Sequence, residues 1–487
     1  MLLAAVDLGS NSFRLEIGRV EGDHILTQGY WKETVRLAAG LDEDMRLSEA
    51  AQDLALATLA RMNERLRGLP AAQVRAVGTQ TLRSARNAAE FLARAEATLG
   101  YPIEVIAGRE EARLVFEGCA HTLPLSPARR LVIDIGGAST ELIVGRGFVA
   151  EQAESFKVGC VNTSVRFFKD GRIDRANLKR AQVAAAAEFE EAASAFSREH
   201  WDEAFGSSGT SGAVSSILRA QGWSDGSITA AGLQRLRHAL LEAGEIRRIK
   251  LDGLKPERQE VIAGGVAVLS AVFEVLGISE MRTARGALRV GLLYDLLGRR
   301  ESRDARDAAV ARMQTRLGID TIQADRVAAL AAPFFAALQP AADHARRQTL
   351  NWAAALHEAG FAISHSEHHK HGAYLVRHSD MAGFSTPDQD RLATLVLAQR
   401  GNLKKVASAL EDRVFADKVL ALRLAIVLLH ARRGVELPTW SLRATATGAQ
   451  FGLDGEWLSR HPLTRYLLDE ESALWARAGR ELLLKVD

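Results

Sequence analysis

Two short segments, residues 4–14 and 131–141, repeat one pattern and constrain the fold more than any other feature of this 487-residue chain. In each segment an apolar run ends in an aspartate, Asp7 or Asp134, and a turn of glycine and hydroxyl residues leads into a second apolar run. This order predicts a β-hairpin whose first strand ends on a carboxylate. Because the pattern occurs twice, we expect a duplicated fold that places two similar turns opposite one another.

Turns of this composition suit phosphate binding. Small residues leave backbone N–H groups accessible to an anion, and a neighbouring carboxylate can hold Mg²⁺ through water. The alternative is ordinary turn chemistry, in which the same residues are common without any ligand; the duplication favours binding. The candidate phosphate loops are Gly9, Ser10, Asn11 and Ser12, followed by Arg14, and Gly136, Gly137, Ala138, Ser139 and Thr140, followed by Glu141. A third such loop, residues 206–210, opens a predicted helix and adds Gly209 and Thr210.

Charged residues lie near these loops in the predicted fold. Glu110 and Glu111 fall in the first turn of a predicted helix, where either could be the general base for an attacking water or could simply interact with the helix dipole. Their spacing does not choose between these roles. Guanidinium groups bind phosphate oxygens in pairs of hydrogen bonds, although any single arginine is more often a solvated surface residue. The candidates are Arg14, Arg83, Arg86, Arg109 and Arg113.

The overall composition excludes several classes of protein. A formal net charge of +2 provides no general basic field, so we expect local anion binding and no nucleic-acid partner. Only two cysteines, Cys119 and Cys160, argue against a disulfide framework and fit a reducing compartment. The first residues carry no basic leader, and the longest apolar stretch, residues 261–273, is too short to span a bilayer. We therefore expect a cytoplasmic protein without a transmembrane segment, and leave peripheral attachment to a membrane open.

The order of predicted elements indicates an α/β protein. Strands at residues 2–8, 12–20 and 24–31 precede alternating helices and strands, giving the order βββαβαβα. A second βββ unit begins at Leu131, after the proline-containing linker 123–127. Helices are then expected at residues 175–198, 230–248, 256–276 and 288–297, with strand-like segments before residue 207 and at 281–287. Helical periodicity dominates from about Glu301, and a small α+β tail ends the chain. The predicted domains are residues 1–124, 125–301, 302–436 and 437–487.

Histidines are concentrated in the helical part. Seven of the thirteen lie between His344 and His378, which could suggest a metal site. A metal site of the HD type needs a His-Asp pair, whereas this chain has His357 followed by Glu358. We therefore expect this cluster to bind no metal.

The chain resembles the long form of the exopolyphosphatase / guanosine pentaphosphate phosphatase family over essentially its whole length. The resemblance is carried by AAVDLGSNSFRL, VGTQTLR, GREEARLVFEG, LVIDIGGASTELIVG, KVGCV, GSSGT, GALRVGLLYDLLGR and LHEAGFAISHSEHHKHGAYLVRHSDMAGF. It implies two ribonuclease-H-like domains of the actin-like ATPase superfamily, an all-α HD-like domain, a small α+β C-terminal domain and a homodimer.

The resemblance also implies an activity. Members of this family use Mg²⁺ to release the terminal phosphate of inorganic polyphosphate, or the 5′ γ-phosphate of pppGpp. The family's catalytic base corresponds to Glu111, and its metal and phosphate positions correspond to Asp7, Arg83, Asp134, Gly136, Gly137, Ser139 and Glu141. One departure is Ala138, where the family usually has a third glycine, so the second loop could be slightly reshaped. The His-Glu pair is shared with long members of the family.

Three alternatives to an exopolyphosphatase remain open at this point. A pppGpp 5′-phosphohydrolase would use the same site, and a kinase of the same superfamily would bind ATP between the loops. A nonenzymatic sensor of polyphosphate or (p)ppGpp belongs to a different class. The intact carboxylates Asp7, Glu111, Asp134 and Glu141 argue against the sensor.

Overall fold

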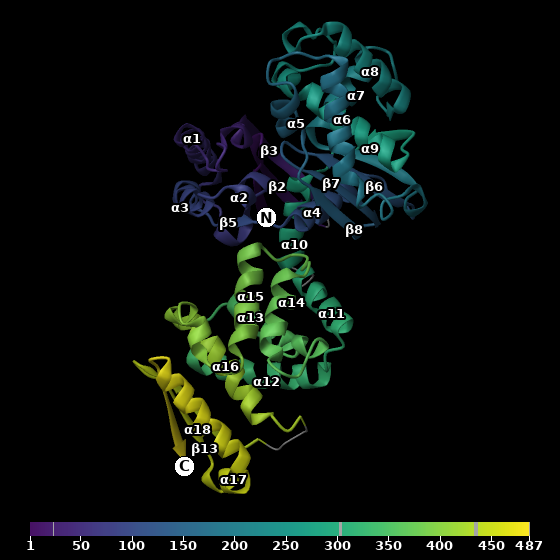
Figure 1. Ribbon diagram of the computed structural model, residues 1–487. Helices are drawn as coiled ribbons and strands as arrows, with labels where there is room; N and C mark the ends of the chain where they lie inside the picture. The colour runs from purple at the N-terminus through teal and green to yellow at the C-terminus, as the bar shows by residue number, and fades with distance from the viewer. Residues whose placement is uncertain (23, 301–303, 433–436, 487) are drawn as a thin grey trace. The chain divides into compact units, whose positions relative to one another are not determined.

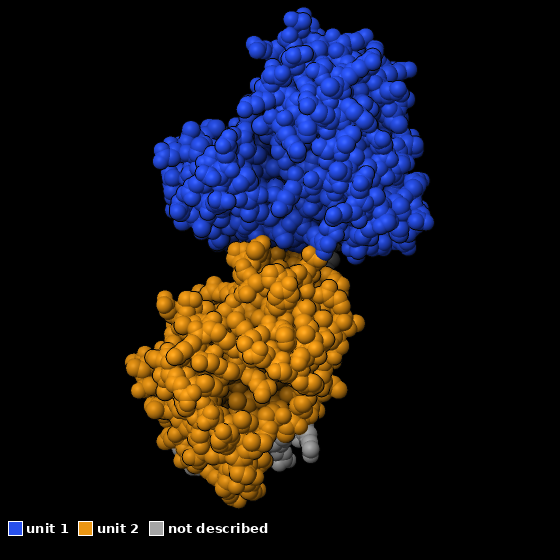
Figure 2. All heavy atoms as spheres, viewed as in Figure 1, with its two compact units in different colours: residues 1–304 blue, residues 305–487 orange. Residues whose placement is uncertain are grey.

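The computed structural model describes residues 1–22, 24–300, 304–432 and 437–486. The chain forms two compact units, residues 1–304 and 305–487 (Figure 1, Figure 2). The first unit contains the mixed α/β part of the chain, and the second contains the helical part and a small sheet. The predicted boundaries at 301/302 and 436/437 fall on residues outside the described part, and the finer division into four domains stays a prediction.

The first half of unit 1 is built on a five-stranded sheet in the order β3-β2-β1-β4-β5. β1 pairs antiparallel with β2 and parallel with β4, and the predicted alternation of strands and helices follows. The strands are β1 (Leu2–Leu8), β2 (Ser12–Glu21), β3 (His24–Thr34), β4 (Val74–Gly78) and β5 (Ile103–Val105). The helices are α1 (Glu49–Leu66), α2 (Gln80–Ser84), α3 (Ala88–Leu99) and α4 (Gly108–Thr122).

The second half repeats this arrangement. Its six-stranded sheet has the order β10-β11-β9-β6-β7-β8, so β8-β7-β6-β9-β11 corresponds to the five strands of the first sheet. Both halves therefore have the sheet order of a ribonuclease-H-like fold, and the predicted α/β architecture with a duplicated domain is confirmed. The strands are β6 (Arg129–Ile135), β7 (Thr140–Arg146), β8 (Val149–Phe156), β9 (Glu203–Ser207), β10 (Ile228–Thr229) and β11 (Glu280–Thr283). The helices are α5 (Cys160–Phe167), α6 (Arg175–Glu190), α7 (Ser208–Ala220), α8 (Ala230–Ala243), α9 (Ile262–Leu276) and α10 (Leu288–Arg300).

Several helix boundaries differ from the sequence predictions. The helix expected to reach residue 198 ends at Glu190, and the one expected to reach 248 ends at Ala243 because Gly244 adopts a left-handed conformation with φ of 69°. The helix expected from residue 256 begins as a 3₁₀ segment, Pro256–Val261, before α9. The segment Pro256–Leu276 is long and apolar enough to cross a membrane, but most of it is buried inside the protein, as expected for a core helix.

Helices α4 and α10 cross with their backbones almost in contact. A Cβ atom added to Gly118 of α4 would lie 2.2 Å from the carbonyl oxygen of Ala287. One added to Gly291 of α10 would lie 1.8 Å from the carbonyl oxygen of Leu114. Only glycine allows this approach. The crossing fixes α10 against the helix that carries Glu111.

Unit 2 combines a helical bundle with a three-stranded sheet of order β12-β13-β14. Both parts contribute to one apolar core; Phe334, for example, packs edge-on against Trp440 and Phe451. The helices are α11 (Ala305–Leu317), α12 (Thr321–Leu338), α13 (His344–Leu356), α14 (His368–His378), α15 (Thr386–Ala398), α16 (Arg413–Leu428), α17 (Gly455–Arg460) and α18 (Pro462–Arg477). The strands are β12 (Trp440–Ala444), β13 (Gly448–Leu453) and β14 (Glu481–Val486).

Candidate functional site

The two predicted hairpins form and bring their turns together within unit 1. A Cβ atom added to Gly137 of the second turn would lie 3.2 Å from Cβ of Ser10 and 3.3 Å from the backbone nitrogen of Asn11 in the first. A cleft of about 620 Å³ opens beside this contact. Its lining includes Asp7, Gly9, Ser10, Asn11, Ser12, Arg14, Thr79, Glu111, Asp134, Gly136, Gly137, Ser139, Glu141, Cys160, Ser208, Gly209, Arg258 and Leu288.

The strand register places charged residues in matching positions of the two hairpins. Asp7 of β1 lies opposite Arg14 of β2, and Asp134 of β6 lies opposite Glu141 of β7. Asp7 and Asp134 are each 6% exposed and Glu141 is 1% exposed. The second hairpin therefore has a carboxylate where the first has a guanidinium, so the cleft contains both anionic and cationic groups.

The second loop is held from behind by the first turn of α5, a helix that the sequence analysis did not predict. The backbone nitrogen of Cys160 donates to the carbonyl oxygen of Gly136 at 2.9 Å, and that of Val161 donates to Gly137 at 2.8 Å. The Asn162 side chain donates to the carbonyl oxygen of Ala138 at 3.2 Å. These bonds direct the loop carbonyls toward α5. Ala138 has no positive φ, so its methyl group fits the loop without backbone strain.

The structure separates the two adjacent glutamates of α4. Glu111 lines the cleft, and Nη1 of Arg83 donates to its Oε2 at 2.9 Å. Glu110 is directed away from the cleft and forms a bidentate pair with Arg113, with two distances of 2.8 Å. Of these two glutamates, only Glu111 is therefore in position to act on a molecule in the cleft.

Burial raises the pKa values of the cleft carboxylates, and neighbouring negative charges add to this rise for Glu111, Asp134 and Glu141. Burial raises the pKa of Glu111, which the Arg83 guanidinium partly offsets. Burial, together with the negative charges of Glu111 and Asp134, holds the pKa of Glu141 well above its usual range. Burial also raises the pKa values of Asp7 and Asp134. A group of buried carboxylates of this kind is typical of a site that receives positive charge.

Buried polar atoms in and beside the cleft lack hydrogen-bond partners among the described residues. Ser12 Oγ, Arg14 Nε and Arg289 Nη1 are available as donors, and Asp134 Oδ1 as an acceptor. Nη1 of Arg289 lies 3.9 Å from Oδ2 of Asp7. Because unpaired buried polar groups are unfavourable, such atoms indicate a polar ligand. The donors suit an anion, and the acceptor suits a cation or its hydration shell.

The carboxylates fit a hydrated divalent cation. No group of three His, Cys, Asp or Glu side chains within the described ranges is arranged to hold a metal directly. Mg²⁺ binds through one or two carboxylates and several waters, so Asp7, Asp134 and Glu141 can serve it without meeting at one point. The unpaired Oδ1 of Asp134 supports this fit.

Some candidates from the sequence lie outside the lining of the cleft. Thr140 and Thr210 are buried, and their hydroxyl groups donate to the carbonyl oxygens of Val158, at 2.5 Å, and Ile135, at 3.2 Å. They support the loops rather than reach into the cleft. Among the candidate arginines, Arg14 lines the cleft and Arg83 contacts Glu111, whereas Arg109 pairs with Glu154 and Arg113 with Glu110.

The structure adds Arg258, a cleft residue that lies outside every predicted loop, and places Ser208 of the predicted loop 206–210 in the cleft lining as well. Arg258 arrives from the segment before α9, and burial lowers its pKa. A Cβ atom on Gly209 would lie 1.5 Å from its guanidinium, so this glycine makes room for the arginine. Ser208 adopts a left-handed conformation, with φ of 59°, at the start of α7. The sequence does not indicate the strained φ of Ser208 or the close approach of Arg258 to Gly209. The one signal in the sequence is the Gly-Ser composition of the loop.

The histidine cluster of unit 2 forms local contacts. Arg432 pairs with Glu358 and, at 3.0 Å, with Asp320. His357 is buried with Nδ1 at 2.6 Å from the carbonyl oxygen of Ala354. The expectation that this cluster binds no metal stays a prediction.

Comparison with known proteins identifies the family. Residues 17–300 match the Ppx/GppA phosphatase family, and residues 305–472 match domain III of Ppx/GppA phosphatases. Among solved structures, an exopolyphosphatase from Cytophaga hutchinsonii shares 24% identity with a TM-score of 0.56, covering 61% of this chain and 98% of that one. An exopolyphosphatase-like protein shares 26% identity with a TM-score of 0.55, covering 62% and 98%. The Ppx/GppA enzyme of Aquifex aeolicus shares 24% identity with a TM-score of 0.51, covering 60% and 99%. With family matches across both units, the chain belongs to the Ppx/GppA phosphatase family.

Proposed function

We propose that this protein is an exopolyphosphatase that hydrolyses the terminal phosphoanhydride bond of inorganic polyphosphate. Family membership supports a phosphatase acting on polyphosphate or pppGpp. The observation that carries the proposal is the position of Glu111: a buried carboxylate in a cleft lined by two phosphate-type loops and oriented by Arg83. We place the enzyme in the cytoplasm and expect it to be a homodimer.

The residues of the cleft suit an in-line hydrolysis. The terminal phosphate would lie between Gly9–Ser12 on one side and Gly136–Ser139 on the other, with Arg14 and Ser12 as hydrogen-bond donors. Glu111 would accept a proton from water as the water oxygen attacks phosphorus, and the bond to the rest of the chain would break on the opposite side. The products are orthophosphate and a polyphosphate shorter by one unit, and no covalent enzyme intermediate is needed.

Asp7, Asp134 and Glu141 would hold Mg²⁺ in this site. When bound, the ion supplies positive charge to the phosphate oxygens, which carry the developing negative charge. Arg14 and the loop N–H groups would add to this stabilisation from the protein side.

The direct test measures phosphate release from long-chain polyphosphate and from pppGpp side by side, with wild-type protein and Glu111→Gln. We expect release from polyphosphate that depends on Glu111. Hydrolysis of pppGpp alone would favour the alternative 5′-phosphohydrolase. Binding of either compound without phosphate release would indicate a sensor, and phosphate transfer from ATP to an acceptor would indicate a kinase.

A further inference from the structure

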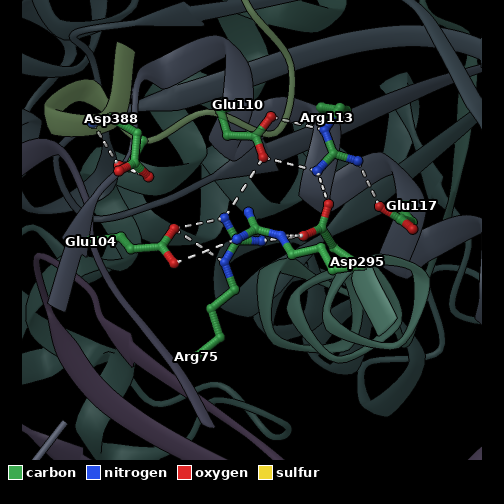
Figure 3. Close-up of polar contacts among 9 residues, drawn as sticks. Arg75, Glu104, Glu110, Arg113, Glu117, Asp295 and Asp388 are labelled. Atoms are coloured by element: carbon green, nitrogen blue, oxygen red, sulfur yellow. Dashed lines mark hydrogen bonds and ion pairs between the residues drawn. The ribbon is translucent and has the colours of Figure 1, made fainter. Parts of the chain in front are cut away.

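A buried network of ion pairs lies behind the helix that carries Glu111 (Figure 3). Its members come from four elements: Arg75 from β4, Glu104 from β5, Glu110, Arg113 and Glu117 from α4, and Asp295 and Arg299 from α10. The side chains of Arg75, Glu110 and Asp295 are each only 2% exposed. Charges buried this deeply are retained only where their partners are well placed.

Glu110 connects the first turn of α4 to this network. Its carboxylate forms two hydrogen bonds to Arg113, at 2.8 Å each, and lies 3.9 Å from Nη2 of Arg75. Arg75 in turn donates to Asp295 at 2.6 Å and to Glu104 at 3.0 Å. Arg113 also pairs with Asp295, so the contacts of Glu110 reach both the sheet and α10 (Figure 3).

The first turn of α4 needs such an anchor because it has no side-chain cap. The residue before the helix is Ala107, which offers no side-chain oxygen to the free N–H groups. Glu111 lies in this same turn, where its carboxylate faces the cleft and accepts a hydrogen bond from Arg83. The position of the Glu111 backbone therefore depends on contacts made by its neighbours.

We infer that Glu110 is the positioning residue for Glu111: it fixes the uncapped first turn of α4 to the buried network, so that the Glu111 carboxylate meets the attacking water in the correct place. This inference rests on the proposed function of Glu111. Glu111 thus faces the cleft, and Glu110 holds the same turn through its contacts with Arg113 and Arg75. A displacement of about 1 Å in a catalytic group can lower a rate by about 10²-fold.

The test compares Glu110→Gln with Glu117→Gln. Both glutamates lie on α4 and bond to Arg113 at 2.8 Å, but Glu117 is nearly two turns farther along the helix. For Glu110→Gln we expect a fall in kcat of about 10–10²-fold with KM for polyphosphate nearly unchanged. Glu117→Gln should keep kcat near that of the wild type. Equal effects of the two substitutions on kcat would overturn the inference, because the network would then act only on stability.

A double-mutant cycle with Glu111→Gln separates positioning from other effects. If Glu110 acts through Glu111, adding Glu110→Gln to the Glu111→Gln variant should lower kcat no further. A further fall of the size seen in the wild-type background would overturn the inference. If Glu111→Gln itself kept wild-type activity, the proposed function of Glu111 would fail, which is a distinguishable result.

A charge-conserving variant decides the question if Glu110→Gln does not fold. Glu110→Asp keeps the negative charge but is one methylene shorter, so it cannot reach Arg113 and Arg75 as the glutamate does. We expect a folded protein with a kcat reduced by about 10-fold and KM nearly unchanged. Wild-type kcat in folded Glu110→Asp would overturn the inference.

Discussion

Arg83 donates from one nitrogen, Nη1, both to Oε2 of Glu111 at 2.9 Å and to the carbonyl oxygen of Ile106 at 2.8 Å. Its other nitrogens donate to Gln80 at 2.9 and 3.1 Å. The bonds to Ile106 and Gln80 therefore hold the guanidinium in place independently of its contact with Glu111. It can therefore orient Glu111 and tune its charge at the same time.

Substitution of Arg83 should shift the pH dependence of the reaction. Burial raises the pKa of Glu111 and Arg83 lowers it, so Arg83→Gln should raise that pKa further. A general base works only when deprotonated, so the acidic limb of the profile of kcat/KM against pH should move to higher pH. A profile measured for the variant with an unmoved acidic limb would show that Glu111 is not the titrating base.

Substitution of Glu111 by glutamine should cause kcat to collapse while polyphosphate still binds. Glutamine keeps the size of the side chain but cannot accept the proton, and loss of a general base lowers rates by about 10²–10⁴-fold. Steady-state kinetics and a separate binding measurement check the two halves of this prediction. Near-normal turnover in Glu111→Gln would exclude the assignment.

The two aspartates should act together on Mg²⁺. Asp7→Ala and Asp134→Ala should each increase the Mg²⁺ concentration needed for half-maximal activity. The double variant should show less than the sum of the two effects in free energy, because both residues act on one site. Activity is measured as a function of Mg²⁺ concentration. Unchanged titration curves in both single variants would contradict this prediction.

Removal of unit 2 should affect long substrates more than short ones. We predict that basic side chains of unit 2 extend the binding track for polyphosphate, since a long polyanion gains affinity from many phosphate contacts and their released counterions. A protein ending at Asp304 is a reasonable comparison, because solved relatives match about three-fifths of this chain over nearly their whole length.

The truncated protein should lose long-chain hydrolysis and processivity far more than hydrolysis of chains of about three or four phosphates. Added salt should inhibit the full-length enzyme more steeply on long chains. Equal losses on both substrates in a folded truncation would rule out the extended track. Metal analysis of the full-length protein should find no transition metal at the histidine cluster.

Acid should destabilise unit 1 through its buried network. The guanidinium groups of Arg75, Arg113 and Arg299 hold the pKa of Asp295 well below its usual range despite burial. The contribution of the Asp295 carboxylate to the free energy of unfolding is therefore complete above the pKa of Asp in the unfolded chain, about 4. This contribution is lost as pH falls below that value toward the pKa of Asp295 in the folded protein. Asp295→Asn should reduce stability by about 3–5 kcal/mol near neutral pH and should weaken the loss on acidification. Denaturant unfolding at neutral and acidic pH measures both effects, and identical pH dependence in wild type and variant would contradict the prediction.

The local parts of the fold could be predicted from the sequence. Each hairpin is specified by neighbouring residues, so the strands that carry Asp7 and Asp134 one residue before their ends could be expected with little knowledge of the rest. The separate roles of Glu110 and Glu111 could not be predicted from spacing, because adjacent helical residues differ in direction and only the packing decides which one faces the cleft. The family resemblance suggests Glu111 as the base, and its place in the lining of the cleft supports this proposal.

Features that depend on distant contacts escaped the sequence analysis. Helix α5 is short, rich in β-branched and small polar residues, and preceded by Gly159, which has no capping side chain; its free N–H groups are satisfied by carbonyls of the loop at Gly136 and Gly137. Arg258 reaches the cleft from a segment without a recognisable motif. The formation of α5 and the position of Arg258 both depend on contacts between residues far apart in the sequence, which a local pattern does not contain.

The close crossing of α4 and α10 limits how this protein could be engineered. Replacing a helical glycine by alanine is normally a simple way to increase thermal stability, because alanine restricts the unfolded chain and favours the helix. At Gly118 the new methyl group would instead lie 2.2 Å from the carbonyl oxygen of Ala287, just before α10, and at Gly291 it would lie 1.8 Å from the carbonyl oxygen of Leu114 in α4. A stabilisation programme guided by helix propensity alone would therefore select two of the positions where it should do most harm, and the damage would spread along α4 to the turn that carries Glu111.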